Sequence, residues 1–291
     1  MTPKRTLILM QVMLAAVWLL PLSSCGDESQ DGFVMDENTP LVILAEIGDD
    51  EVESPGTRAD VSASNAYDRS SFIAGDKINV VCTRAGATIA SAGYAIGSDG
   101  KWTVADGATG LVFLPAITCR AEFPVNYDGI MTDQSTPGAF LKSNLLATAE
   151  VNVSGAEINF TGNNALTHRH ARLTLNFEGE NTLPAFSQMI VEGTGLRTGG
   201  SASERINLLR PVEGEYSWCA VIYPRTAGSA IDVTITDEYG ITYKVQLSLA
   251  SVAANKNYIY KLTLQNNVLV PVGNEIKAWN VKNRYTGGFD N

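Results

Sequence analysis

The sequence predicts an all-β protein built from antiparallel β-sandwiches. Apolar residues alternate with polar or small ones from residue 72 onward, as in Leu173–Phe177, Ile231–Ile235 and Ile241–Leu249. A period of two indicates strands with one buried and one exposed face. The turn signal Glu238-Tyr239-Gly240 predicts a hairpin between the last two of these strands. Helical spacing is nowhere sustained, so we expect only a short helix around Phe140–Ala149.

A compact apolar run, Pro40–Ile47, precedes this region, and an acidic loop, Gly48–Arg58, follows it. Because the run is almost continuously apolar, it predicts a first strand that is buried on both faces. An ordinary first strand of the sandwich is the alternative.

The beginning of the chain indicates export as a lipoprotein. Lys4 and Arg5 lead into an apolar stretch, which predicts a signal peptide over residues 1–24. Leu22-Ser23-Ser24-Cys25 has the form of a lipobox, in which the thiol of Cys25 is acylated before cleavage. Three fatty-acyl chains of the palmitate type would hold the mature protein on a membrane. A plain secretory signal with an incidental cysteine, or a retained membrane anchor, are the alternatives.

A short acidic segment, Gly26–Asp31, follows the lipid site and reads as a solvated tether. It resembles the acidic run that marks lipoproteins of some Gram-negative anaerobes for the outer face of the outer membrane. We therefore expect a surface-exposed protein of the cell outer membrane.

Charge and length bound the remaining possibilities. Removal of residues 1–24 takes away two basic residues and no acid, which leaves 19 Lys and Arg against 31 Asp and Glu, a net charge of −12. Such a surface disfavours nucleic acid as a partner. The remaining length suits one large domain or two moderate ones.

Three cysteines remain in the mature chain besides Cys25: Cys82, Cys119 and Cys219. Their number is odd and their spacing is not C-x-x-C, so neither a zinc site nor a full disulfide framework is indicated. At most one bridge can form. We favour buried small side chains within strands.

No constellation for catalysis or metal binding stands out. His168 and His170 lie on a strand-like segment, Leu166–Leu173, where alternate residues share a face, but no third ligand lies near in sequence. We expect a structural or half-exposed pair, and no metal. Asp237 and Glu238 are adjacent on a strand, so they point to opposite faces and cannot flank one glycosidic bond.

Common catalytic and cofactor motifs are also missing from the sequence, including G-x-S-x-G, H-E-x-x-H and the phosphate-binding glycine loops. The sequence therefore predicts a protein that is not an enzyme and needs no cofactor. Trp102, Trp218 and Trp279 fall within strand patterns, which favours core packing over sugar stacking.

Several groups of residues, taken in order, resemble the fimbrillin family, the lipoprotein subunits of type V pili and their Mfa-like relatives. The pieces are the lipobox at Cys25, Thr57-Arg58-Ala59, Phe72–Val80, Trp102, Phe123-Pro124, Ile158–Phe160, Leu166–Leu173, Ala220–Pro224, Asn257–Thr263 and Ile276–Trp279. The chain departs from the family pattern in two places. A glycine usually stands where Asn255 or Asn257 stands here, and one histidine usually precedes Ala171.

The resemblance implies two tandem Greek-key, transthyretin-like β-sandwich domains, which we place at residues 59–164 and 165–291, the second ending in a short tail. It also implies a mechanism. An arginine-specific protease would cut between Arg58 and Ala59, residues 25–58 with the first strand would leave, and a strand from a neighbouring subunit would fill the opened groove.

The implied function is that of a fimbrial subunit or fimbrillin-like surface adhesin, with other fimbrial subunits and the outer membrane as partners. The sequence does not identify its receptor on host or bacterial surfaces. Asn280–Asn291 contains Gly287-Gly288, which interrupts any donor strand, so a stalk, tip, anchor or stand-alone role is equally compatible. The alternative is a surface lipoprotein that binds glycans and does not polymerise.

Overall fold

The computed structural model describes residues 36–48, 67–178, 183–213 and 215–279, which all belong to one compact unit of the chain. Within these residues the protein is all-β, as predicted, with several antiparallel sheets. Short helical pieces accompany the strands, namely α1 (Pro137–Ser143) and the 3₁₀ turn η1 (Gly162–Asn164). No helix of the described part is long and apolar enough to cross a membrane.

One sheet follows the order β4-β3-β2-β5-β6-β9, with β7 paired to β5. Its strands are β2 (Lys77–Arg84), β3 (Ala87–Ile96), β4 (Trp102–Val104), β5 (Thr118–Phe123), β6 (Leu146–Ala147), β7 (Val151–Asn152) and β9 (Thr167–His168). A separate pair joins β1 (Val42–Ala45) in parallel to β8 (Glu157–Phe160). These elements surround a buried cluster, the first core, whose members include Ile43, Ile78, Val80, Tyr94, Trp102, Phe123, Ile158, Phe160 and Leu166.

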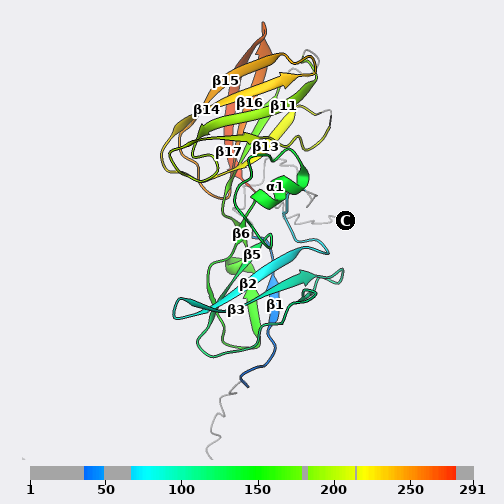
Figure 1. Cartoon of the computed structure of the whole chain (residues 1–291), viewed down its shortest axis with the longest axis vertical. Helices are drawn as coiled ribbons and strands as arrows, with labels where there is room; N and C mark the ends of the chain where they lie inside the picture. The colour runs from blue at the N-terminus through cyan, green and yellow to red at the C-terminus, as the bar shows by residue number, and fades with distance from the viewer. Residues whose placement is uncertain (1–35, 49–66, 179–182, 214, 280–291) are drawn as a thin grey trace, which may run out of the picture. The chain divides into compact units, whose positions relative to one another are not determined.

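Two further sheets have the orders β13-β10-β16-β17 and β12-β11-β14-β15 (Figure 1). Their strands are β10 (Ala171–Phe177), β11 (Phe186–Thr194), β12 (Ser203–Asn207), β13 (Ser217–Ile222), β14 (Ser229–Asp237), β15 (Thr242–Leu249), β16 (Lys256–Gln265) and β17 (Val268–Ala278). Both sheets contribute to a second core, whose members include Phe140, Leu173, Leu175, Val191, Trp218, Cys219, Ile231, Val233, Leu247 and Trp279.

The alternating sequence pattern predicted these strands well. Ile231, Val233 and Ile235 alternate along β14 and are fully buried. The predicted hairpin joins β14 to β15 in antiparallel register. Gly240 adopts a positive φ of 81° in its turn, a conformation that glycine tolerates without strain.

The predicted helix is shorter than expected and begins earlier. Thr136 caps its start, because the hydroxyl oxygen accepts a hydrogen bond from the Ala139 amide at 3.3 Å, and Pro137 occupies the first turn. The helix ends before Asn144, which is extended, and the chain continues into β6. The expectation of a helix over the second half of 140–149 is therefore wrong.

The segment around the two histidines also differs from expectation. It is not one strand: β9 pairs with β6 and ends at His168, whereas β10 begins at Ala171 and pairs with β13 and β16 in another sheet. The chain thus passes from one sheet to the other between these two strands. The division into domains at residue 164 stays a prediction.

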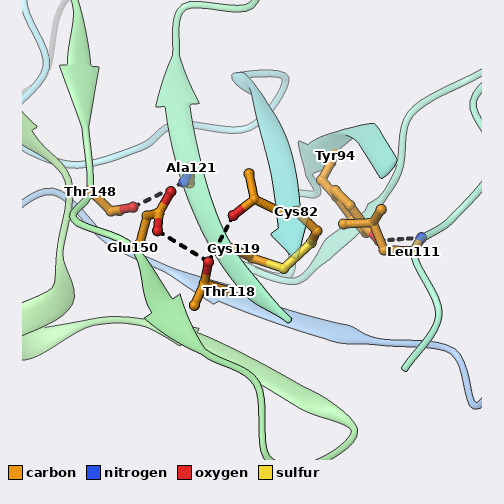
Figure 2. The surroundings of a disulfide bond; sticks show 9 residues. Cys82, Tyr94, Leu111, Thr118, Cys119, Ala121, Thr148 and Glu150 are labelled. Atoms are coloured by element: carbon orange, nitrogen blue, oxygen red, sulfur yellow. Dashed lines mark hydrogen bonds between the residues drawn. A yellow bond between two sulfur atoms is a disulfide. The ribbon is translucent and has the colours of Figure 1, made fainter. Parts of the chain in front are cut away.

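The two cysteines of neighbouring strands form a disulfide, contrary to our preference for separate buried side chains. Cys82 of β2 and Cys119 of β5 are direct partners in the antiparallel register, with Cα atoms 4.1 Å apart. Figure 2 shows this bridge between the strands, with Thr118 and Glu150 on one side and Tyr94 and Leu111 on the other. Cys219 is a buried free thiol, as expected.

Candidate functional site

The first strand packs against the first core. Leu41, Ile43 and Ile47 are buried in this core, with exposed fractions of 6%, 1% and 1%. Val42 and Leu44 point the other way and are 55% and 39% exposed. The prediction of burial on both faces is therefore wrong, because nothing in the described part covers the outer face of β1.

Backbone hydrogen bonds hold both edges of this strand segment. At its start, the Leu41 amide donates to the Leu111 carbonyl at 2.9 Å, and the Phe113 amide donates to the Thr39 carbonyl at 2.7 Å. The middle pairs in parallel with β8, in the register Ile43 to Ile158. The segment therefore pairs with β8 along its middle and with residues 111–113 at its start.

The end of the segment is held in the same way. The Leu166 amide donates to the Glu46 carbonyl at 2.9 Å, and the Gly48 amide donates to the Leu166 carbonyl at 2.8 Å. The indole Nε1 of Trp102 donates to the Ala45 carbonyl at 3.2 Å. These groups would lose their partners if residues 38–48 departed, and buried backbone groups without partners are costly.

Tyr94 fixes Leu111, which forms a wall beside the start of the first strand. The Leu111 amide donates to the hydroxyl of Tyr94 at 2.9 Å, while the Leu111 carbonyl accepts from Leu41 of the first strand. Burial raises the pKa of Tyr94, so its hydroxyl stays protonated at neutral pH. Sequence reasoning missed this wall, because its contacts join residues that no local pattern connects.

The predicted processing sites cannot be placed. Cys25, Arg58 and Ala59 lie outside the described residues. β1 ends at Ala45 and β2 begins at Lys77, so Arg58 and Ala59 belong to the connection between these two strands.

The two histidines are structural side chains in separate environments. His168 is buried, its Nδ1 lies 2.8 Å from Oδ1 of Asn144, and its ring stacks on Trp279. His170 Nε2 lies 2.6 Å from the Tyr127 hydroxyl. Burial lowers the pKa of His170 to about 4. Among the described residues, no group of three or more His, Cys, Asp or Glu side chains could hold a metal ion.

The acidic pair at the β14–β15 turn has a structural role. The Asp237 carboxylate accepts hydrogen bonds from the amides of Tyr239 and Ile241 at 2.9 and 2.8 Å, and from the Tyr243 hydroxyl at 3.2 Å. Asp237 is buried and Glu238 is exposed, so they do not face each other across a cleft. This arrangement shapes a hairpin.

The tryptophans pack in the cores, as predicted. Trp102 belongs to the first core, and Trp218 and Trp279 belong to the second. None of them offers an exposed ring face for a sugar. Tyr239, at the tip of the β14–β15 hairpin, is 78% exposed.

The fold of this chain is similar to that of solved protein structures. No protein-family model and no curated protein sequence matches the chain. Two crystal structures, each described as a "putative cell adhesion protein", share its fold. That of Bacteroides ovatus has a TM-score of 0.60 at 16% identity and covers 84% of this chain and 99% of its own. That of Bacteroides uniformis has a TM-score of 0.55 at 14% identity and covers 72% and 93%.

The tip fimbrial protein Mfa3 of Porphyromonas gingivalis aligns at a lower TM-score of 0.46 and 12% identity, over 83% of this chain and all of that one. That likeness is too low to support an argument. The two stronger likenesses establish the fold alone. This fold is all-β, as the sequence predicted.

Proposed function

We propose that the protein is a fimbrillin-like subunit of a surface adhesive structure, exported as a lipoprotein through Cys25. Its first strand is an exchangeable element that leaves after cleavage between Arg58 and Ala59. A strand of a neighbouring subunit then takes its place. The role is structural and adhesive, not enzymatic, and its site is the outer face of the outer membrane or a fimbria.

One observation carries this proposal: the first strand packs in the first core and pairs with β8, but is joined to these later elements covalently only through residues 49–66. Its buried aliphatic side chains lie in that core, and its backbone hydrogen bonds reach β8, Leu111, Phe113 and Leu166, which all come later in the sequence. After a cut at Arg58, only non-covalent contacts would retain it. An incoming strand with the same alternation could satisfy the same groups.

The test is strand exchange on the full-length chain. The protein is cut with an arginine-specific protease, the new N-terminus is identified by mass spectrometry, and a labelled peptide of residues 36–48 is added. We expect stoichiometric incorporation of the peptide into the cut protein and none into the uncut protein.

A matched peptide with Ile43→Asp is the control, because a buried carboxylate in the first core is strongly unfavourable. A second control peptide carries Val42→Asp, whose side chain lies on the exposed face. Equal incorporation of the Ile43 and Val42 variants, or no incorporation of the native peptide, would overturn the exchange mechanism.

The lipid anchor is tested separately with Cys25→Ser. We expect this variant to lose fatty-acid labelling and to leave the membrane fraction, because acyl chains provide the anchoring free energy. Continued membrane association of the variant would contradict the lipoprotein part of the proposal.

The second candidate is a surface lipoprotein that binds glycans without polymerising. The observation in its favour is the exposed ring of Tyr239 at a hairpin tip, which could stack on a sugar face. Glycan binding that Tyr239→Ala abolishes, together with a first strand that does not exchange, would favour this candidate.

A further inference from the structure

A cluster of buried charges lies directly after the segment that contains Arg58. Asp68, Arg69 and Asp76 are 3%, 5% and 8% exposed. The side chain of Arg172, on β10, is 14% exposed. Charges at this depth are rare and are retained only when they are paired.

Asp68 binds to elements of the second core. One of its carboxylate oxygens accepts a hydrogen bond from Nη1 of Arg172 at 2.7 Å. Its two oxygens also lie 3.1 and 3.3 Å from the indole Nε1 of Trp279, which follows β17. A residue near the first sheet thereby fixes partners 104 and 211 positions further along the chain.

The next residue, Arg69, binds beside the first core. The guanidinium of Arg69 donates to both oxygens of Asp76, at 2.9 and 3.1 Å. Asp76 immediately precedes β2, and its carbonyl accepts the Ile96 amide at the end of β3. A two-pronged guanidinium–carboxylate pair is among the strongest polar contacts in proteins. Asp68 thus binds residues at the second core, and the adjacent Arg69 binds Asp76 beside the first core.

Aromatic rings cover the ion pair. The guanidinium carbon of Arg172 lies 5.9 Å from the centre of the Tyr67 ring and 6.0 Å from that of Phe140. Trp279, the second donor to Asp68, stacks on His168 of β9, with ring centres 4.1 Å apart and planes within 4°. These rings exclude water and strengthen the electrostatic attraction.

The guanidinium of Arg172 is charged despite its burial. Burial by itself lowers its pKa, but Cys219, Asp68 and Tyr67 together more than compensate and raise it above the ordinary value. Burial raises the pKa of the adjacent Cys219 thiol to about 11, so this thiol is neutral at pH 7. The acidic partner of Arg172 is Asp68, whose Oδ2 lies 2.7 Å from Nη1.

We propose that Asp68 and Arg69 form a buried clasp that couples the two cores into one cooperative unit and fastens the chain immediately after the Arg58 segment. The sequence motifs around Asp76, His168, Arg172 and Trp279 converge on this clasp. If the strand exchange proposed above occurs, the clasp is also what keeps the newly created N-terminal region attached while the first strand leaves.

The test uses Asp68→Asn on the uncut full-length protein, so its outcome does not depend on strand exchange. Cys219 is a native reporter, because it is fully buried beside Arg172. We expect its alkylation rate, measured by mass spectrometry of the Cys219 peptide, to rise at least about 100-fold, the effect of leaving one member of a buried ion pair without its partner. Asp232→Asn is the matched control and should leave the rate unchanged, because this carboxylate is exposed and accepts a hydrogen bond from Gln246 at 2.9 Å.

Hydrogen exchange then separates coupling from general destabilisation. In the native protein, the slowest amides of β2 and of β14 should exchange with the same opening free energy, and in Asp68→Asn they should differ. Trp279→Phe, which keeps the ring but removes the donor to Asp68, serves if Asp68→Asn does not fold; we expect a rise in alkylation of about 10-fold. Unchanged Cys219 protection in the variant that folds, or equal exchange of both cores in it, would overturn the clasp.

Discussion

The geometry of the first strand predicts a sharp difference between neighbouring positions. Ile43 is 1% exposed in the first core, and Val42 is 55% exposed. Burying one aliphatic side chain stabilises by about 1.5–3 kcal/mol, so Leu41, Ile43 and Ile47 together contribute about 5–9 kcal/mol to holding the strand in place. Truncation of a buried isoleucine costs about 2–5 kcal/mol, because a cavity adds to the lost burial.

We therefore expect Ile43→Ala to increase local opening of the strand by about 30-fold to several thousand-fold, and Val42→Ala by less than about threefold. The assay is hydrogen exchange of the peptide covering residues 41–47, whose Leu41, Val42 and Glu46 amides are hydrogen bonded. Denaturant unfolding run in parallel gives the global stability. Equal effects at the two positions would refute the assignment of the strand faces.

Three further predictions concern single features of the fold. Replacing both Cys82 and Cys119 by alanine should lower the free energy of unfolding by about 2–4 kcal/mol, measured by denaturant titration, and added reductant should then have no further effect. The pKa of His170, lowered to about 4, means that the unfolded state takes up its proton first as pH falls. Stability should thus decrease by up to about 3 kcal/mol from pH 6.5 to 4, and His170→Gln should flatten this slope. Asn255 has a φ of 64°, so Asn255→Gly should be nearly neutral in thermal unfolding, whereas Asn255→Val should cost about 1–2 kcal/mol.

The last of these bears on the resemblance to fimbrillins, which leads us to expect a glycine where either Asn255 or Asn257 stands. Only Asn255 has a positive φ, and asparagine is the residue that most readily replaces glycine in that conformation. The carbonyl of Asn255 accepts the Trp279 amide at 3.1 Å, which places this turn beside the clasp.

Local patterns predicted the strands because alternation is a property of consecutive residues. The alternation of Leu173, Leu175 and Phe177 predicts β10 even though its partner strands are distant in sequence. The same reasoning was wrong for Pro40–Ile47, since an apolar run does not reveal how many faces the fold covers. Val42 and Leu44 are exposed although their side chains are as apolar as that of the buried Ile43.

Long-range pairings could not be predicted for a different physical reason. Nothing near Cys82 specifies the register that places Cys119 opposite it. The same holds for the contact of Asp68 with Trp279, which joins two residues 211 positions apart. These contacts depend on how sheets meet, which the composition of each strand does not encode.

We propose that the first strand is removed at Arg58 and replaced by a strand of another subunit. The decisive experiment is mass spectrometry of the protein extracted from the cell surface, beside a gel that preserves denaturation-resistant oligomers. We expect an N-terminus at Ala59 in a ladder of oligomers. An acylated Cys25 on a monomer that forms no ladder would contradict it.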